Sequence, residues 1–124
     1  MTNKQFSQLI QQFRRDQDKL IKFKGHDYTI GGNQDRLFNF KWVAKVLGIS
    51  PLQVLSVYWL KHVLAILTYI KTRGVKSESV LSRFLDENNY NLLGYALIRD
   101  ILKLKGSQLC QKKRKKSKKK KPSK

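Results

Sequence analysis

The chain has 124 residues, which is enough for one domain and too few for two independent hydrophobic cores. Lysine and arginine total 27 against 8 acidic residues, so the formal net charge is +19, and ten of the basic residues lie in the last 13 positions. The single cysteine, Cys110, excludes an internal disulfide, and with only two histidines it also excludes a standard structural zinc site. Glutamate occurs only at Glu78 and Glu87, which weighs against an enzyme that depends on a dense carboxylate cluster.

The first predicted element is an amphipathic helix from Asn3 to about Phe23. Its apolar residues recur at helical spacing: Phe6, Leu9, Ile10, Phe13, Leu20 and Ile21. The next segment, KFKGHDYTIGGNQ, has three glycines and little apolar periodicity, so it predicts a loop, with room for a short hairpin around Gly25–His26.

A second helix is predicted from Gln34 or Asp35 to Leu47. Asn33 suits the N-cap, and Gly48 suits the position just past the last turn. The third helix has the clearest start in the chain, because Ser50 can cap its free amide groups and Pro51 loses no hydrogen bond at the first helical position.

The third helix is predicted to run to Thr72, where Arg73–Gly74 stops it, and the fourth to run from Ser77 or Ser79 to Lys105 before Gly106. Four helices joined by short loops predict an all-α fold, a small four-helix bundle over residues 1–106. Residues 107–124 predict a disordered lysine-rich tail, because they cannot bury enough apolar surface to fold.

Residues 51–70 form an apolar stretch just long enough to span a bilayer. Lys61 and His62 lie at its midpoint, where a charged side chain costs roughly 2.5–3.5 kcal/mol on insertion scales. We therefore expect a buried core helix and no membrane partner. The N-terminus has no apolar core of the signal-peptide kind, so we expect an intracellular protein.

The C-terminal tail predicts a polyanionic partner. Its run of basic residues comprises Lys112, Lys113, Arg114, Lys115, Lys116, Lys118, Lys119, Lys120 and Lys121. Nucleic acid fits best, since each phosphate contact releases counterions. The tail has no aromatic residue for base stacking, so we expect non-specific binding. A solubilising or expression-related extension, an anionic membrane surface and a nuclear-import address are the alternatives.

Polar residues also interrupt the two long apolar helices. If the third and fourth helices form an antiparallel hairpin, His62 and Asp86 lie at the same level, roughly 16 Å from the turn at about 1.5 Å per residue. Lys61 or His62 could then meet Asp86, and Asn89 shares the face of Asp86. One interpretation is a partly buried Lys61–Asp86 ion pair. The other is a polar pocket for a phosphate or nucleotide, with His62 as a proton carrier.

The start of the second helix favours the pocket interpretation. Asp35, Arg36 and Asn39 share one face there, beside a glycine-bearing loop and free backbone amides. Arg36 could hold a phosphate with two hydrogen bonds.

Three short motifs, Asp35-Arg36-x-x-Asn39-Phe40, Lys61-His62 and Asp86-x-x-Asn89-Tyr90, resemble a pattern of small helical bacteriophage proteins. Those proteins resemble the phage nucleotide-modification-associated domain and, more remotely, the MazG-type all-α nucleotide pyrophosphohydrolases. The resemblance covers roughly residues 26–100. It implies a phage origin, hence the host cytoplasm, a helical bundle and a link to nucleotide or DNA metabolism. The site residues it implies are Asp35, Arg36, Asn39, Lys61, His62, Asp86, Asn89 and Tyr90.

The sequence departs from the MazG pattern at the metal-binding positions. Those enzymes hold Mg²⁺ through E-E-x-x-E and E-x-x-D motifs, because this hard cation needs several carboxylate oxygens. This chain has no E-x-x-E motif, and Arg83 stands three residues before Asp86. We therefore predict no metal site, assign no catalytic residue and no cofactor, and expect Mg²⁺-dependent hydrolysis to be absent unless a second subunit in a homo-oligomer supplies carboxylates.

Three functions follow. The one we favour is a small phage-type protein that binds nucleic acid non-specifically through its tail and basic body. The second is a nucleotide-binding protein or degenerate pyrophosphohydrolase-like enzyme. The third is a virion or assembly component that contacts the packaged genome.

Overall fold

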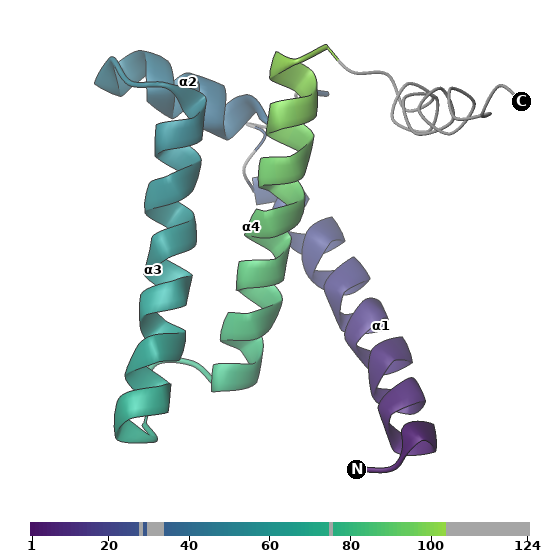
Figure 1. Ribbon diagram of the computed structural model, residues 1–124. Coiled ribbons are helices and arrows are strands. Elements are labelled where there is room, and N and C mark those ends of the chain that lie inside the picture. The colour runs from purple at the N-terminus through teal and green to yellow at the C-terminus, as the bar shows by residue number, and fades with distance from the viewer. Residues whose placement is uncertain (28, 30–33, 75, 104–124) are drawn as a thin grey trace, which may run out of the picture.

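The computed structural model describes residues 1–27, 29, 34–74 and 76–103 (Figure 1). These residues form four helices in the order α1 (Asn3–Asp27), α2 (Phe38–Leu47), α3 (Pro51–Thr72) and α4 (Val80–Ile101), and the described part of the chain has no strand. The fold is therefore all-α, as the sequence predicts. The predicted tail, with its basic residues, and the predicted N-cap Asn33 lie outside the described residues.

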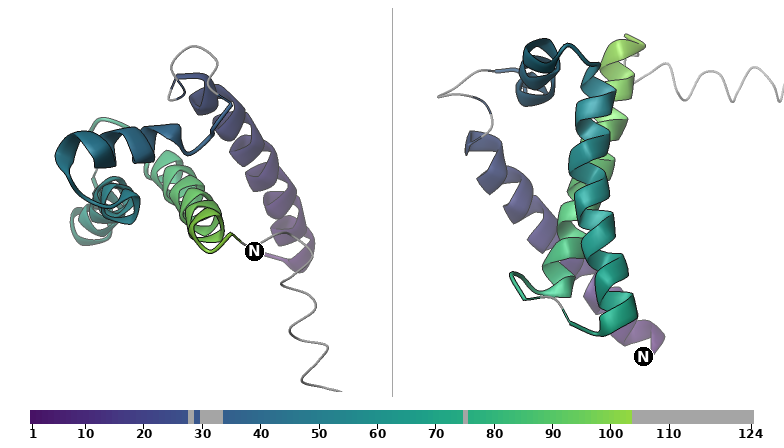
Figure 2. Two further views of the ribbon diagram at one scale, coloured as in Figure 1. Left: turned by 90° about the horizontal axis from the view of Figure 1, so that it is seen from above. Right: turned by 90° about the vertical axis from the view of Figure 1, so that its left-hand side faces the viewer.

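The helices are arranged around an antiparallel pair. α3 and α4 run side by side, α2 crosses near the N-terminal end of α3, and α1 lies on the other side of α4 (Figures 1 and 2). α1 leans away from α4 toward its N-terminus, and every residue from 1 to 15 is exposed.

The residues that cap the helices confirm three of the predicted helix ends. The Ser50 hydroxyl accepts from the Gln53 amide at 3.2 Å, and the Gln53 side chain accepts from the Ser50 amide at 2.8 Å, which makes a capping box. Gly48 adopts φ 67°, which is the left-handed conformation expected of the residue after a helix. Of the two serines proposed to start α4, Ser79 is the N-cap and accepts from the Ser82 amide at 3.1 Å.

The predicted loop is wrong over residues 22–27, because α1 continues to Asp27 and leaves no hairpin at Gly25–His26. The Arg36 side chain donates to the Ile21 carbonyl at 2.8 Å, and a Cβ atom at position 25 would lie 1.8 Å from its guanidinium. Glycine at position 25 thus allows Arg36 to approach the helix closely, rather than making a turn.

The start predicted for the second helix is also wrong, because α2 begins at Phe38. The Asp35 carboxylate accepts from the Leu37 amide at 2.9 Å, and the Asp35 carbonyl accepts from the Phe38 amide at 3.1 Å. Residues 35–38 therefore form a turn before the helix, with Arg36 and Leu37 at its centre. At the other end of the chain α4 stops at Ile101 and does not reach the predicted end at Lys105, which lies outside the described residues.

The buried core is small and lies where α2 crosses α3 and α4. It consists of Leu37, Phe40, Ala44, Val54 and Leu97. Within it, Phe40 and Leu97 are the largest fully buried side chains. Gly94 lets the two long helices approach, since a Cβ atom there would lie 2.9 Å from the Leu55 side chain.

The expectation that α3 is a buried core helix is wrong for most of its surface. Its buried residues are Val54, His62 and Ile66. By length and composition α3 could cross a membrane, and 17% of its most apolar window is buried. Leu60, Leu64 and Leu67 are each more than half exposed.

Candidate functional site

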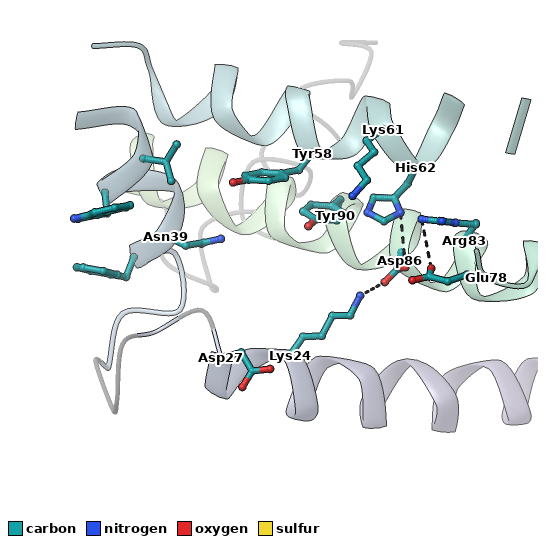
Figure 3. A pocket seen from close by; sticks show the side chains of 13 residues that line it. Lys24, Asp27, Asn39, Tyr58, Lys61, His62, Glu78, Arg83, Asp86 and Tyr90 are labelled. Atoms are coloured by element: carbon teal, nitrogen blue, oxygen red, sulfur yellow. Dashed lines mark hydrogen bonds and ion pairs between the residues drawn. The ribbon is translucent and has the colours of Figure 1, made fainter. Parts of the chain in front are cut away.

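A pocket of about 450 Å³ opens between the C-terminal end of α1, the start of α2, the middle of α3 and the first half of α4 (Figure 3). Its lining residues are Lys24, Asp27, Phe38, Asn39, Trp42, Val43, Tyr58, Lys61, His62, Glu78, Arg83, Asp86 and Tyr90. The structure thus brings together five of the predicted site residues, namely Asn39, Lys61, His62, Asp86 and Tyr90.

Asp86 is the most buried charged residue of the pocket, and its side chain is 7% exposed. The Lys24 ammonium from α1 donates to it, and the His62 Nδ1 atom lies 3.7 Å from its other oxygen. The sequence correctly placed His62 opposite Asp86. The proposed Lys61–Asp86 ion pair is wrong, because Lys24 supplies the cation and lies in a segment that the sequence assigned to a loop.

His62 is buried beside Asp86, and its ring stacks on Tyr90 with centroids 5.1 Å apart. Burial lowers the pKa of His62 below its ordinary value, and the positive charges of Arg83, Lys24 and Lys61 lower it further, against the opposing effect of Asp86. The imidazole is therefore neutral at pH 7.

Arg83 reaches the pocket from the first turn of α4. One of its terminal nitrogens lies 3.4 Å from the Glu78 carboxylate, and the other donates to the Ser77 hydroxyl at 2.8 Å. Its side chain is only 11% exposed, whereas that of Glu78 is 52% exposed. Arg83 is thus the buried member of this pair, and Glu78 is its solvent-exposed member.

Three buried polar atoms at or next to the pocket make no hydrogen bond to any residue the structure describes. They are Nδ1 of His62, Nε of Arg83 and Oδ1 of Asn89. A buried polar atom without a partner costs about 1–3 kcal/mol, so most such atoms in proteins are satisfied by the chain, by water or by a ligand. Their concentration here indicates that the pocket suits a polar guest.

The aromatic side chains form a column along one wall. Tyr58 and Tyr90 are nearly parallel, with centroids 6.1 Å apart and an interplanar angle of 13°, and Phe40 meets Tyr58 edge to face at 6.3 Å. Phe38 and Trp42 add two further rings from α2. Flat apolar surfaces of this kind bind planar ring systems.

Lys61 lies at the exposed side of the pocket (Figure 3). It makes no hydrogen bond or ion pair with another residue in the described part of the chain, so its charge is available to a ligand. The lining contains three basic side chains, Lys24, Lys61 and Arg83, against three carboxylates, and with His62 neutral it has no formal excess charge.

The remaining predicted residues lie elsewhere. Asp35 accepts from Lys41 at 2.7 Å, which lowers the pKa of its carboxyl group, and Lys41 also pairs with Asp100 at 3.0 Å. Lys41 thus connects α2 to the end of α4, and Asp35 helps to hold its ammonium group. Arg36 holds α1, as described above. Asn89 lines a very small cavity of about 20 Å³ next to the pocket, with Arg36 and Asn39.

Several pocket residues escaped the sequence analysis, among them Lys24, Arg83, Tyr58 and Trp42. Continuing the helical spacing by one turn from Leu20 would have placed Lys24 on the face of α1 that packs against the domain. Arg83 precedes Asp86 by three residues on α4 and so shares its face.

No group of three or more His, Cys, Asp or Glu side chains that could hold a metal ion occurs within residues 1–27, 29, 34–74 and 76–103. Comparison with protein-family models, with curated proteins and with solved structures finds no match. The resemblance to phage proteins therefore stays a prediction based on the short motifs.

The Lys24–Asp86 pair should be energetically coupled, and Lys61 should not be. Lys24→Met leaves the buried carboxylate without its cation and should lower the free energy of unfolding by about 2 kcal/mol, less than for a fully buried pair because Lys24 is partly exposed. In a urea double-mutant cycle with Asp86→Asn, the two losses should be strongly non-additive. The matched cycle with Lys61→Met should be additive, and coupling in that cycle instead would contradict this geometry.

The lowered pKa of His62 should make folding pH-dependent. The folded state holds the neutral imidazole, so below about pH 6.5 the unfolded chain binds more protons and stability falls as the pH falls. NMR titration of the His62 ring should give a pKa below 6.5, and His62→Gln should remove this part of the loss between pH 7.5 and 5.5. His26→Gln, at an exposed position, is the control. A His62 pKa above 6.5 would contradict the assignment.

Proposed function

We propose that this protein binds nucleic acid through its positive charge and that its pocket takes a single nucleotide unit. The observation that carries the pocket assignment is the combination of an aromatic wall, buried polar atoms without partners and one uncommitted lysine. The aromatic wall can stack a base, the polar atoms without partners can form hydrogen bonds to the edge of the base, and the lysine can pair with the phosphate.

The base is assigned to the aromatic wall. Tyr58 and Trp42 line the pocket with aromatic rings, and stacking of a base on an aromatic side chain is worth about 1–3 kcal/mol. Asn39 can both donate to and accept from a base edge, while His62 and Arg83 offer buried polar atoms on the opposite side.

The phosphate is assigned to Lys61 at the exposed side of the pocket. The balance of three cations and three carboxylates in the lining argues against a triphosphate, whose several negative charges would meet Asp27, Glu78 and Asp86. A nucleoside monophosphate, or one nucleotide of a single strand, adds less charge and suits this lining better. The proposal is for binding rather than hydrolysis, because Asp86 and Glu78 are each paired with a cation.

Binding to the polymer is supported by composition. A net charge of +19 on 124 residues favours a polyanion, and the basic residues in the last 13 positions offer about nine phosphate contacts. The phage setting and the link to viral nucleotide or DNA metabolism are part of the same proposal and rest on the short motifs quoted above.

Removing the basic tail should weaken nucleic-acid binding. A chain ending at Gln111 should keep its melting temperature, lose most of its affinity for duplex DNA, and show a log–log salt slope shallower by about eight, since about nine contacts disappear. Fluorescence anisotropy at several salt concentrations measures both quantities. A full-length chain with the tail Lys and Arg residues changed to Gln is the matched control and should behave like the truncation. Unchanged affinity would assign binding to the helical body.

Occupancy of the pocket should raise the melting temperature. With a panel of nucleoside monophosphates, a binding ligand at a hundred times its dissociation constant adds about 2.7 kcal/mol of stability. Lys61→Ala should weaken that ligand roughly tenfold or more, as expected for the loss of a charge-assisted hydrogen bond. Lys45→Ala removes the same charge from an exposed position on α2 and should have little effect.

Two results would reject the pocket assignment. One is that no nucleotide shifts the melting curve, and the other is that both lysine variants weaken binding equally. Magnesium-dependent release of pyrophosphate that disappears in Asp86→Asn would instead favour the enzyme alternative.

A further inference from the structure

The small cavity of about 20 Å³ next to the pocket is surrounded by polar groups from four parts of the fold. They come from the end of α1, the turn before α2, α2 itself and the middle of α4. Its polar lining residues are Lys24, Arg36, Asn39, Asn89 and Tyr90. Arg36, Asn39 and Asn89 belong to the short sequence motifs, so these motifs meet at the small cavity.

Asn89 brings a buried hydrogen-bond acceptor to this cavity. The residue is 4% exposed, and its Oδ1 atom makes no hydrogen bond to any residue that the structure describes. A buried acceptor without a donor destabilises the folded state, and nearly all such atoms in proteins have a partner. Because Asn89 lines the cavity, a donor inside the cavity lies within its reach.

The volume of the cavity limits the size of that donor. A polar cavity needs at least about 10–15 Å³ of accessible space to hold a water molecule, whose share of liquid water is about 30 Å³. At about 20 Å³, the cavity has room for one water molecule. A base, a phosphate or a second water molecule is too large for it.

The charges of the lining select among the small molecules and ions of this size. Lys24 and Arg36 bring positive charge, and the described residues that line the cavity include no carboxylate, so a cation is disfavoured. A halide ion would suit the two basic groups, but it has no proton to donate to Asn89. Water can donate to Asn89 and at the same time accept from Arg36, whose guanidinium has five N–H groups.

We propose that the small cavity is the binding site of one internal water molecule, which bridges the Asn89 side chain on α4 and the Arg36 guanidinium before α2. Arg36 also donates to the Ile21 carbonyl at 2.8 Å, so the water completes a chain of hydrogen bonds from α4 through the turn to α1. Asn39 adds a partner from α2, which agrees with the two to four hydrogen bonds that internal waters make.

The water site is separate from the proposed nucleotide site, although the two are neighbours. Lys24, Asn39 and Tyr90 line both cavities, so the water lies directly behind one wall of the larger pocket. Within this arrangement Arg36 and Asn89 bind water and hold the helices together, whereas Lys61 faces the ligand. The inference does not depend on whether a nucleotide binds, because the small cavity cannot admit one.

A high-resolution crystal structure of the full-length wild-type chain tests the site directly. We expect one ordered water within hydrogen-bonding distance of both Asn89 Oδ1 and the Arg36 guanidinium. A crystal soaked in sodium bromide distinguishes water from a halide, because bromide scatters anomalously. An anomalous peak in the cavity, a water that contacts only one of the two groups, or a cavity without density would each overturn the proposal.

Oxygen-17 relaxation dispersion tests the same site in solution, since it counts water molecules that stay bound for longer than free exchange allows. Asn89→Leu replaces the amide by a branched apolar group of similar shape, and it should lose one long-lived water relative to the wild type. Asn91→Leu makes the same change at an exposed position of α4 and should keep the count. Equal counts in the wild type and in Asn89→Leu would contradict the proposal.

Circular dichroism checks that both variants keep the helix content of the wild type. If Asn89→Leu does not fold, the wild type alone still decides the matter. Nuclear Overhauser effects should then connect a long-lived water to the side-chain amide protons of Asn89, and their absence would reject the site.

Discussion

Asp86 is the group on which the arrangement of three helices depends. Its carboxylate is buried on α4, its cation comes from Lys24 near the end of α1, and His62 faces it from α3. Burial of a carboxylate is tolerated only when an opposite charge and hydrogen bonds accompany it. Because the apolar core is small and lies at the other end of α3, near α2, this polar contact and the hydrogen bond from Arg36 to the Ile21 carbonyl together fix α1 against the rest of the domain. The pocket exists because α1 is held there.

The same contact determines what the pocket can bind. With Lys24 committed to Asp86 and Arg83 facing Glu78, the positive charge left for a ligand is concentrated at Lys61, on the exposed side. The interior contributes aromatic faces and neutral polar atoms, since burial keeps His62 uncharged. A guest with one anionic end and a flat, hydrogen-bonding body matches this division. A polyphosphate would have to displace carboxylates that already have partners.

The sequence predicted the fold well where local signals act alone. The Ser50 cap at the start of α3 and the place of Gly48 just after α2 depend on neighbouring residues, and both were confirmed. It failed where a distant residue changes the meaning of a local one. Gly25 indicated a turn, but it serves the close approach of Arg36 within a helix. Because of that error Lys24 was placed in a loop, and the cation opposite Asp86 was predicted to be Lys61. His62 and Asp86 were paired correctly because counting residues from an antiparallel turn requires no knowledge of α1.

The thin core also explains why α3 offers two different surfaces. Packing against α2 and α4 buries only Val54, His62 and Ile66 of this helix. On the rest of its surface Val57, Leu60, Leu64 and Leu67 each stay more than half exposed to water. The same helix therefore supplies a buried imidazole to the pocket and leaves most of its apolar side chains in contact with solvent.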